Sequence, residues 1–165
     1  MKYPTLFALF LALSFTHLVP CLGQEGEGED SEIPINQRAT AAAWVALRAG
    51  DNQKAIEKAN ECIVRFQKPA DTVQSILEQQ KTVLPTGNVS NEERARIDRF
   101  QILHDVATCL LIRAWAEESL GLQKQATSDY AEVRKYTYAR TSEKPGEPLW
   151  STAEVAVQNL QRLSP

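Results

Sequence analysis

The sequence has few cysteines, glycines and prolines, and each shortage excludes a class of protein. Three cysteines in 165 residues are too few for a miniprotein held together by disulfides. Seven glycines and eight prolines exclude a collagen-like chain and extended low-complexity sequence. The formal net charge of −3 is unlike the clustered positive charge of nucleic-acid-binding proteins, so no nucleic-acid partner is expected. What remains is the composition of an ordinary domain, long enough for one sizeable core.

Long apolar runs are also absent, except near the start of the chain. A basic residue there precedes an apolar stretch over residues 6–18, which is typical of a signal peptide and short for a membrane span. We expect a signal peptide over residues 1–23, cleaved after Gly23, and an exported protein that is periplasmic or secreted. The alternative is a lipid anchor on Cys21, which the preceding Pro20 disfavours. No later run of about 18 apolar residues occurs, so no integral membrane span is predicted.

The rest of the chain divides into a linker and a domain. Residues 24–35 carry acidic side chains and no basic one, with few apolar groups, so we expect an acidic flexible linker. Residues 36–165 are expected to form the domain. Apolar residues recur there with helical spacing, and no alternating run bounded by turns indicates a strand. The expected fold class is therefore all-α.

Caps and breakers predict about six helices in this domain. They are expected over residues 37–49, 52–66, 72–81, 91–120 and 123–136, and from residue 152 onward. Gly50 and Gly121 each end a helix, and Pro69 is expected to separate the second helix from the third. Capping-box patterns are expected to open three helices, at Asp71, Ser90 and Ser151.

Two segments of the domain share the same spacing of residues. Each has a tryptophan six residues before a glycine and an alanine five residues after it: Trp44, Gly50 and Ala55 in the first segment, and Trp115, Gly121 and Ala126 in the second. The glycine permits a tight turn, and small residues let paired helices approach closely. The two glycines are separated by about twice a period of 34 residues.

This spacing resembles the tetratricopeptide repeat, whose antiparallel helix pairs stack into a right-handed array. Ala43 and Ala114 match the small residue of the first helix in each pair, and Tyr130 matches the aromatic residue of the second. The stretch that begins at His104-Asp-Val-Ala-Thr and the loop that contains Trp150 also resemble a group of exported bacterial tetratricopeptide proteins of uncharacterised function. The resemblance implies a groove that binds a protein or peptide partner.

The repeat also predicts which side chains face that groove. In the tetratricopeptide frame, the residues six and two or three positions before the glycine can lie on the concave side. This makes Trp44, Arg48, Trp115 and Glu118 the candidate binding residues, because tryptophan offers a large apolar contact and arginine adds charge-assisted hydrogen bonds. The alternative is that both indole rings simply pack between helices. Solvent access separates the two, since a groove residue keeps an exposed ring edge.

Two further expectations concern packing. The helix at 72–81 is expected to lie across the stack, or to be followed by a crossover loop. The repeat makes the helices at 37–49 and 91–120 equivalent and therefore parallel, whereas strict alternation with two helices between them would leave them antiparallel. Trp150 is expected to be substantially buried against Val155 of the last helix.

No motif in the sequence indicates catalysis. A glycine-rich phosphate loop, HExxH and GxSxG are absent from the sequence. His104 lies on an apolar stripe and is expected to be a core or boundary residue, and no metal ligand set or cofactor site is expected. Glu117 and Glu118 are adjacent, so they point about 100° apart and do not form an acid–base pair.

Two sets of residues keep more than one interpretation. Cys62 and Cys109 could form a disulfide in an exported protein or remain buried thiols. Three arginines, at 94, 96 and 99, alternate with acidic residues and are expected to form a solvated helix surface.

The leading interpretation is a non-enzymatic interaction module that binds a protein or peptide. The alternative is a small-ligand-binding protein or an enzyme that uses a pocket between helices. A cleft with two or more perturbed titratable groups would favour an enzyme, and an apolar, aromatic-bearing concave face would favour an interaction module.

Overall fold

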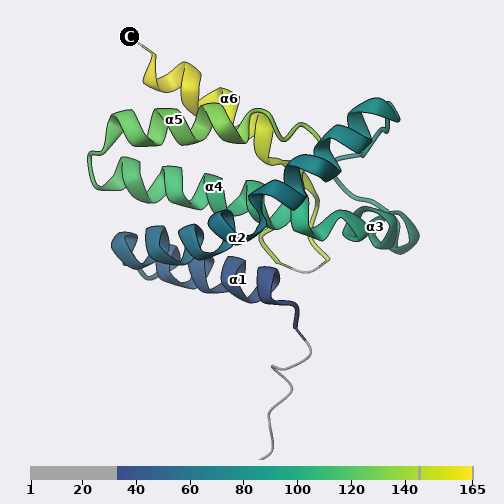
Figure 1. The fold of residues 1–165 in the computed structure, drawn as a ribbon, viewed down its shortest axis with the longest axis horizontal. Coiled ribbons are helices and arrows are strands. Elements are labelled where there is room, and N and C mark those ends of the chain that lie inside the picture. The colour runs from purple at the N-terminus through teal and green to yellow at the C-terminus, as the bar shows by residue number, and fades with distance from the viewer. Residues whose placement is uncertain (1–32, 145, 165) are drawn as a thin grey trace, which may run out of the picture.

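The fold is all-α, with one small antiparallel pair of strands (Figure 1). The computed structural model describes residues 33–144 and 146–164. The expected signal peptide, Cys21 and most of the acidic linker therefore lie outside the described residues. The elements are α1 (Ile35–Arg48), α2 (Asn52–Gln79), α3 (Asn91–Ile97), the 3-10 helix η2 (Asp98–Phe100), α4 (Gln101–Ser119), α5 (Gln123–Val133), β1 (Arg140–Thr141), β2 (Trp150–Ser151) and α6 (Thr152–Leu163).

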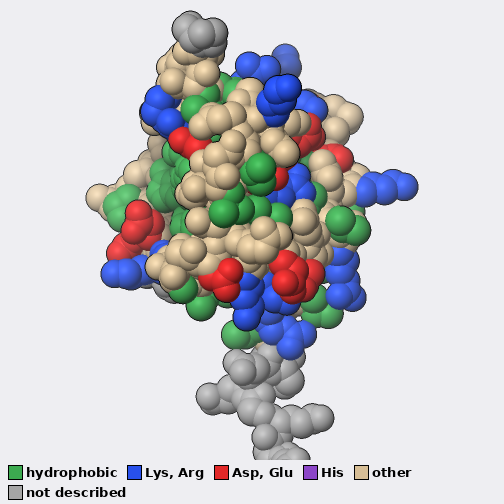
Figure 2. Space-filling model, turned by 90° about the vertical axis from the view of Figure 1, so that its left-hand side faces the viewer, with side chains coloured by type: hydrophobic (Ala, Val, Ile, Leu, Met, Phe, Trp, Pro, Cys, Tyr) green, Lys and Arg blue, Asp and Glu red, His purple; other side chains and the backbone are tan. Residues whose placement is uncertain are grey.

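Helix α4 is the centre of the domain. It contacts α1, α2, α5 and α6, and it is buried on nearly every side (Figure 1). Neighbouring helices α1, α2, α4 and α5 alternate in direction, and the α1–α2 and α4–α5 turns lie at the same end of the molecule. Figure 2 views that end, where apolar side chains reach the surface in several places among charged ones. None of the described helices has the length and apolar character needed to cross a membrane.

The two glycine turns have the same structure. Gly50 and Gly121 both adopt φ of 76°, a left-handed conformation that a side chain disfavours. In each turn the glycine N–H donates to the carbonyl three residues earlier, and the next N–H donates to the carbonyl five residues earlier. Ala55 and Ala126, five residues beyond each glycine, are fully buried. The predicted ends of these helices, and the equivalence of the two segments at these positions, are confirmed.

The predicted break at Pro69 is wrong, because α2 continues through it to Gln79. Proline costs about 3 kcal/mol inside a helix through a lost hydrogen bond and a clash. Here the buried face stays in phase on both sides of the proline, and burial of that face outweighs the cost. Its members are Ala55, Ala59, Cys62, Ile63, Ala70, Gln74 and Leu77. Asp71 is consequently inside the helix rather than a cap.

Continuity of α2 also overturns the expected irregularity in the stack. With residues 52–79 in one helix, only α2 lies between α1 and α4 as a long helix, so simple alternation leaves α1 and α4 parallel (Figure 1). No separate helix at 72–81 lies across the stack.

The long helix predicted over residues 91–120 is interrupted. Helix α3 ends at Ile97, and η2 turns the chain before α4 starts at Gln101. At this break the Gln101 N–H donates to the Asp98 carbonyl in the 3-10 pattern. The His104 ring nitrogen Nε2 lies 2.9 Å from the Ile97 carbonyl oxygen. The imidazole therefore satisfies a backbone group at the end of α3, which stabilises the turn.

The remaining caps are mostly as predicted. Ser90 and Glu93 form a complete capping box at α3, and the Ser151 hydroxyl accepts from the Glu154 N–H at the start of α6. Helix α5 ends at Val133, three residues earlier than expected. Trp150 is partly buried and packs against the core, so the ring keeps some exposed surface.

Candidate functional site: a groove along α1 and α4

A groove runs along α1 and α4, and residues after α5 form its other side. It consists of two adjoining hollows that share Trp44 and Glu143. The polar hollow has a volume of about 510 Å³, and its defining side chains come from α1, α4 and the segment after β1: Gln37, Thr40, Gln101, Asp105 and Ser142. The tryptophan hollow has a volume of about 480 Å³ and is lined by Trp44, Leu47, Trp115, Glu118, Ser119, Glu143 and Arg162.

Three of the four predicted binding residues, Trp44, Trp115 and Glu118, line the tryptophan hollow, and Arg48 lies beside it over the Trp44 ring. The rings of Trp44 and Trp115 have centroids 5.7 Å apart and planes inclined at 48°. The Arg48 guanidinium lies 5.0 Å from the centroid of the Trp44 ring and donates to the Glu143 carbonyl oxygen at 3.2 Å. Trp44 and Trp115 are both partly buried, pack against the hydrophobic core and line the tryptophan hollow. The four nominated residues therefore form one cluster, and their role in binding stays a prediction.

Glu118 is held in place by groups from two other helices. Its carboxylate accepts from Arg162 of α6 at 2.7 Å and from the Tyr130 hydroxyl of α5 at 2.9 Å. The hydrogen bond from Arg162 is the main cause that lowers the pKa of Glu118. Arg162 lines the same hollow and carries no signal in the sequence that would have identified it.

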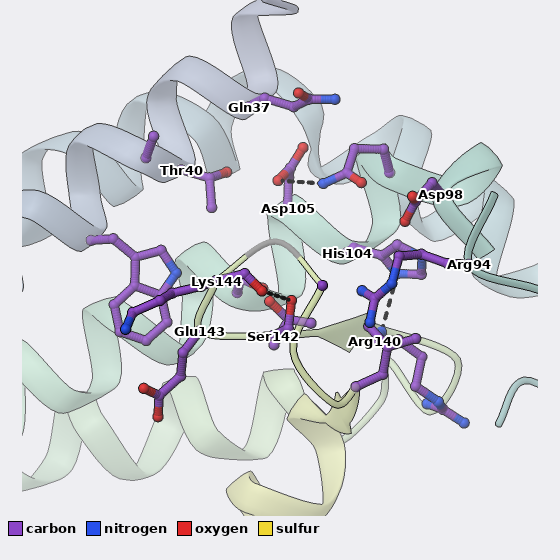
Figure 3. A pocket seen from close by; sticks show the side chains of 17 residues that line it. Gln37, Thr40, Arg94, Asp98, His104, Asp105, Arg140, Ser142, Glu143 and Lys144 are labelled. Atoms are coloured by element: carbon purple, nitrogen blue, oxygen red, sulfur yellow. Dashed lines mark hydrogen bonds between the residues drawn. The ribbon is translucent and has the colours of Figure 1, made fainter. Parts of the chain in front are cut away.

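The polar hollow has a buried carboxylate, Asp105, on its α1–α4 side (Figure 3). Only 4% of Asp105 is exposed. Its carboxylate accepts from the Asn36 side-chain amide at 2.5 Å and from the Gln101 side-chain amide at 3.0 Å. Burial raises the pKa of Asp105, and the hydrogen bonds from Gln101 and Asn36 oppose that rise. The carboxylate is thus partly compensated by neutral donors.

His104 lies beside Asp105 in the chain but has a structural role. Its Nε2 pairs with the Ile97 carbonyl oxygen, and its Nδ1 accepts from the Arg140 backbone N–H at 3.1 Å (Figure 3). Nε2 must therefore carry the proton in the neutral ring. Burial is the main cause that lowers the pKa of His104 to about 4. The predicted core position is confirmed, and neither ring nitrogen is left to act on a substrate.

The side of α4 that packs against α2 and α5 carries an ion pair. Arg113 donates to both carboxylate oxygens of Asp129 on α5, at 2.5 and 2.7 Å, and also to the side-chain oxygen of Asn60 on α2. Glu117 is buried beside this pair, and one of its oxygens has no hydrogen-bond partner. Burial, followed by the charge of Asp129, raises the pKa of Glu117 to about 7. Glu117 and Glu118 therefore have separate environments.

Cys62 and Cys109 are free, buried thiols, so the structure has no disulfide between them. The Thr40 hydroxyl oxygen lies 3.4 Å from the Cys109 sulfur and 3.9 Å from the Cys62 sulfur. Contact with Cys62 and burial raise the pKa of the Cys109 thiol, so it stays protonated.

The three-arginine segment is only partly a solvated surface. Arg96 and Arg99 are exposed as expected, whereas Arg94 is partly buried. Arg94 donates to the Glu147 carbonyl oxygen and lines the polar hollow. It holds the segment between β1 and β2 against α3.

Sequence reasoning missed the polar hollow. A signal for Asp105 was present, because it is the only Asp, Glu, Lys or Arg between Arg99 and Arg113, within an otherwise apolar stretch. The other half of the hollow, residues 140–144, follows no helical period and carried no signal.

Searches for known sites and relatives add no assignment. Within residues 33–144 and 146–164, no group of three His, Cys, Asp or Glu side chains is placed to hold a metal ion. Comparisons with family models, curated proteins and solved structures found no match to this chain.

Proposed function

We propose that this protein is a non-enzymatic interaction module that binds an extended peptide segment of a partner protein along the groove. The observation that carries the proposal is the continuity of the two hollows through Trp44 and Glu143. A single small ligand fills one cavity, whereas two open, adjoining hollows suit successive side chains of a peptide. The partly exposed tryptophan pair supplies the kind of aromatic anchor that dominates binding energy at protein interfaces.

The environment of the titratable groups favours binding over catalysis. His104 and Asp105 both line the polar hollow and both have shifted pKa values, which is the pattern expected of an enzyme. However, both nitrogens of His104 are occupied by backbone groups, and Asp105 accepts hydrogen bonds from amides rather than from the imidazole. The pair therefore has no arrangement for moving a proton.

We also propose that the interaction module is tetratricopeptide-like, and two features of the paired helices support this. The two glycine turns share one geometry, and the equivalent alanines Ala43 and Ala114 are both fully buried. An exported bacterial protein that presents this groove outside the cytoplasm would agree with the apolar stretch over residues 6–18.

The test is selection of a displayed library of random peptides on the full chain, followed by titration of the selected peptides. Trp44→Ala and Trp115→Ala remove the aromatic anchors and should each weaken binding about tenfold or more. Glu143→Lys changes an exposed side chain shared by both hollows, so it tests the groove without altering the core.

The matched controls are Val64→Ala and Glu92→Lys. Both residues are exposed and lie outside the two hollows, and neither substitution should change binding. The proposal is wrong if no peptide is selected, or if the groove variants and the controls bind the selected peptides equally well.

A second candidate function is binding of a small molecule in the polar hollow alone. Its volume of about 510 Å³ favours this candidate, because it falls in the range of ordinary ligand pockets. In that case Trp115→Ala would leave the affinity for the small molecule unchanged, because Trp115 lines only the tryptophan hollow.

A further inference from the structure

Asp105 is a buried charge that lacks a counter-charge. Among the described residues, no Lys, Arg or His nitrogen lies within 4.0 Å of its carboxylate, although the Asp129 carboxylate has Arg113. An unpaired buried carboxylate is costly because two neutral amides replace only part of its hydration. A carboxylate of this kind at the edge of an open cavity is positioned to meet a positive group from outside.

Asp105 is the charged residue that α1 and α4 contribute to the polar hollow, and Gln37 and Thr40 on the same side are uncharged (Figure 3). The other charged residues of the lining come from α3, η2 and the segment after α5. They are the acidic residues Asp98 and Glu143 and the basic residues Arg94, Arg140 and Lys144.

Those basic groups are engaged by other parts of the chain. The Arg140 guanidinium donates to four backbone carbonyls, at Leu84, Pro85, Thr137 and Ala139. Arg94 donates to the Glu147 carbonyl, and the Lys144 ammonium is 3.9 Å from the Glu147 carboxylate. Arg140 and Arg94 are therefore held away from Asp105 by their own contacts, whereas Lys144 is exposed and its long contact with Glu147 does not fix its position.

The same hollow offers a surface for the stem of a long basic side chain. Trp44 lines it next to Thr40, one turn along α1, and Glu143 stands at the mouth that leads to the tryptophan hollow. Aromatic rings attract ammonium and guanidinium groups and pack against methylene stems.

From this arrangement we infer that the polar hollow binds a primary ammonium or guanidinium group, supplied by a lysine or arginine side chain of the bound peptide. The carboxylate of Asp105 accepts hydrogen bonds from the cation, and the Trp44 ring contacts its stem. The inference rests on the proposed function, because the peptide that supplies this side chain occupies the groove.

The experiment uses two displayed libraries that differ in one respect. One contains all residue types, and the other lacks lysine and arginine. Selection on the full chain should enrich one basic position in the peptides from the first library. The second library should give no binders or much weaker ones. Replacing that basic residue by glutamine in the selected peptide should weaken binding to the unmodified protein about tenfold or more, since a charge-assisted hydrogen bond is lost.

The protein variant Asp105→Asn tests the same contact from the other side. It keeps the shape of the side chain and removes the charge, so it should weaken binding of the basic peptide about tenfold and leave its glutamine version unaffected. Glu92→Gln is the matched control, because it makes the same chemical change at an exposed position outside the groove. If Asp105→Asn fails to fold, the comparison of peptides on the unmodified protein still decides the question.

The outcomes separate this inference from the proposed function. Peptides that bind in the groove without a basic position, and equally well to Asp105→Asn, overturn the inference and leave the function intact. Failure of both libraries overturns both. Cadaverine and ethylguanidinium are the free-cation probes, and binding of either as tightly as the peptide would show that the cation does not come from a peptide.

Discussion

Two buried carboxylates lie next to helix α4, Asp105 of α4 itself and Asp129 of α5, and they are satisfied in different ways. Asp129 receives both ends of the Arg113 guanidinium. Asp105 receives two neutral amides and borders a cavity of about 510 Å³. A carboxylate with its own cation completes a structural contact, whereas one without a cation at an open cavity remains available to a ligand. The comparison teaches that the counter-charge, rather than burial, distinguishes the two roles.

The largest effect is expected at the ion pair. Arg113→Ala should lower the free energy of unfolding by about 3 kcal/mol, because it leaves Asp129 buried and unpaired next to Glu117. Urea denaturation measures this loss. Arg134→Ala, at an exposed position on the C-terminal side of α5, is the control and should change stability by less than about 0.5 kcal/mol. If Arg113→Ala also changed the free energy of unfolding by less than about 0.5 kcal/mol, the ion pair would not stabilise the fold. Asp129 could then no longer be contrasted with Asp105 as the structural carboxylate.

The protein should lose stability in acid because His104, which lines the polar hollow, becomes protonated. Its pKa is lowered to about 4 from an ordinary value of 6.5, mainly by burial, so folding favours the neutral ring. The contribution is present above pH 6.5 and is lost as the pH falls through 4, by about 3 kcal/mol. The positive charge of Arg140 also lowers the pKa of His104. Stability measured against His104→Gln from pH 7 to 4 isolates this contribution. Parallel curves for the two proteins would contradict it.

Glu117 should make stability respond to pH in the reverse direction. The pKa of Glu117 is raised to about 7 from an ordinary 4.5, by burial and by Asp129, so folding favours its protonated form. This contribution is present below pH 4.5 and is lost as the pH rises through 7. Relative to Glu117→Gln, the unmodified protein should therefore become less stable from pH 4.5 to 8 in thermal unfolding. If the unmodified protein keeps or gains stability relative to Glu117→Gln between pH 4.5 and 8, the pKa of Glu117 is not raised in the fold and the prediction is wrong.

The smallest effect on stability is expected at Asp105. Asp105→Asn removes a charge whose pKa is raised by burial, and rotation of the Asn36 or Gln101 amide can restore the hydrogen bonds. The free energy of unfolding should change by less than about 1 kcal/mol at pH 7. If urea denaturation showed that Asp105→Asn lowers the free energy of unfolding by much more than this, Asp105 would have a structural role like that of Asp129. The proposed difference between the two carboxylates would then be wrong.

The parts of the fold that local chemistry decides were predictable. Gly50 and Gly121 ended helices where expected, since a left-handed residue closes a helix whatever packs against it. The Ser90 and Ser151 caps were equally local. Pro69 predicted a helix end that does not occur, because Ala59, Ala70 and the other buried positions of α2 stay in phase across it.

The sequence likewise signals some residues of the candidate site and gives no signal for others. The repeated spacing brought Trp44 and Trp115 into one cluster, because equivalent positions on parallel neighbouring helices lie side by side. Asp105 could be noticed as a lone charge in an apolar stretch. Its amide partner Asn36 and the opposite wall at 140–144 are distant in the chain, and no spacing rule relates them.

Local sequence specifies the helical class, the two matching turns and the helix caps, because each depends on residues within a few positions of one another. Packing of the whole chain is needed to explain why α2 runs through Pro69, why the chain bends after Ile97 and why a cavity opens beside Asp105. These three features follow from burial and hydrogen bonding between distant segments. Such contacts can outweigh a local penalty of about 3 kcal/mol.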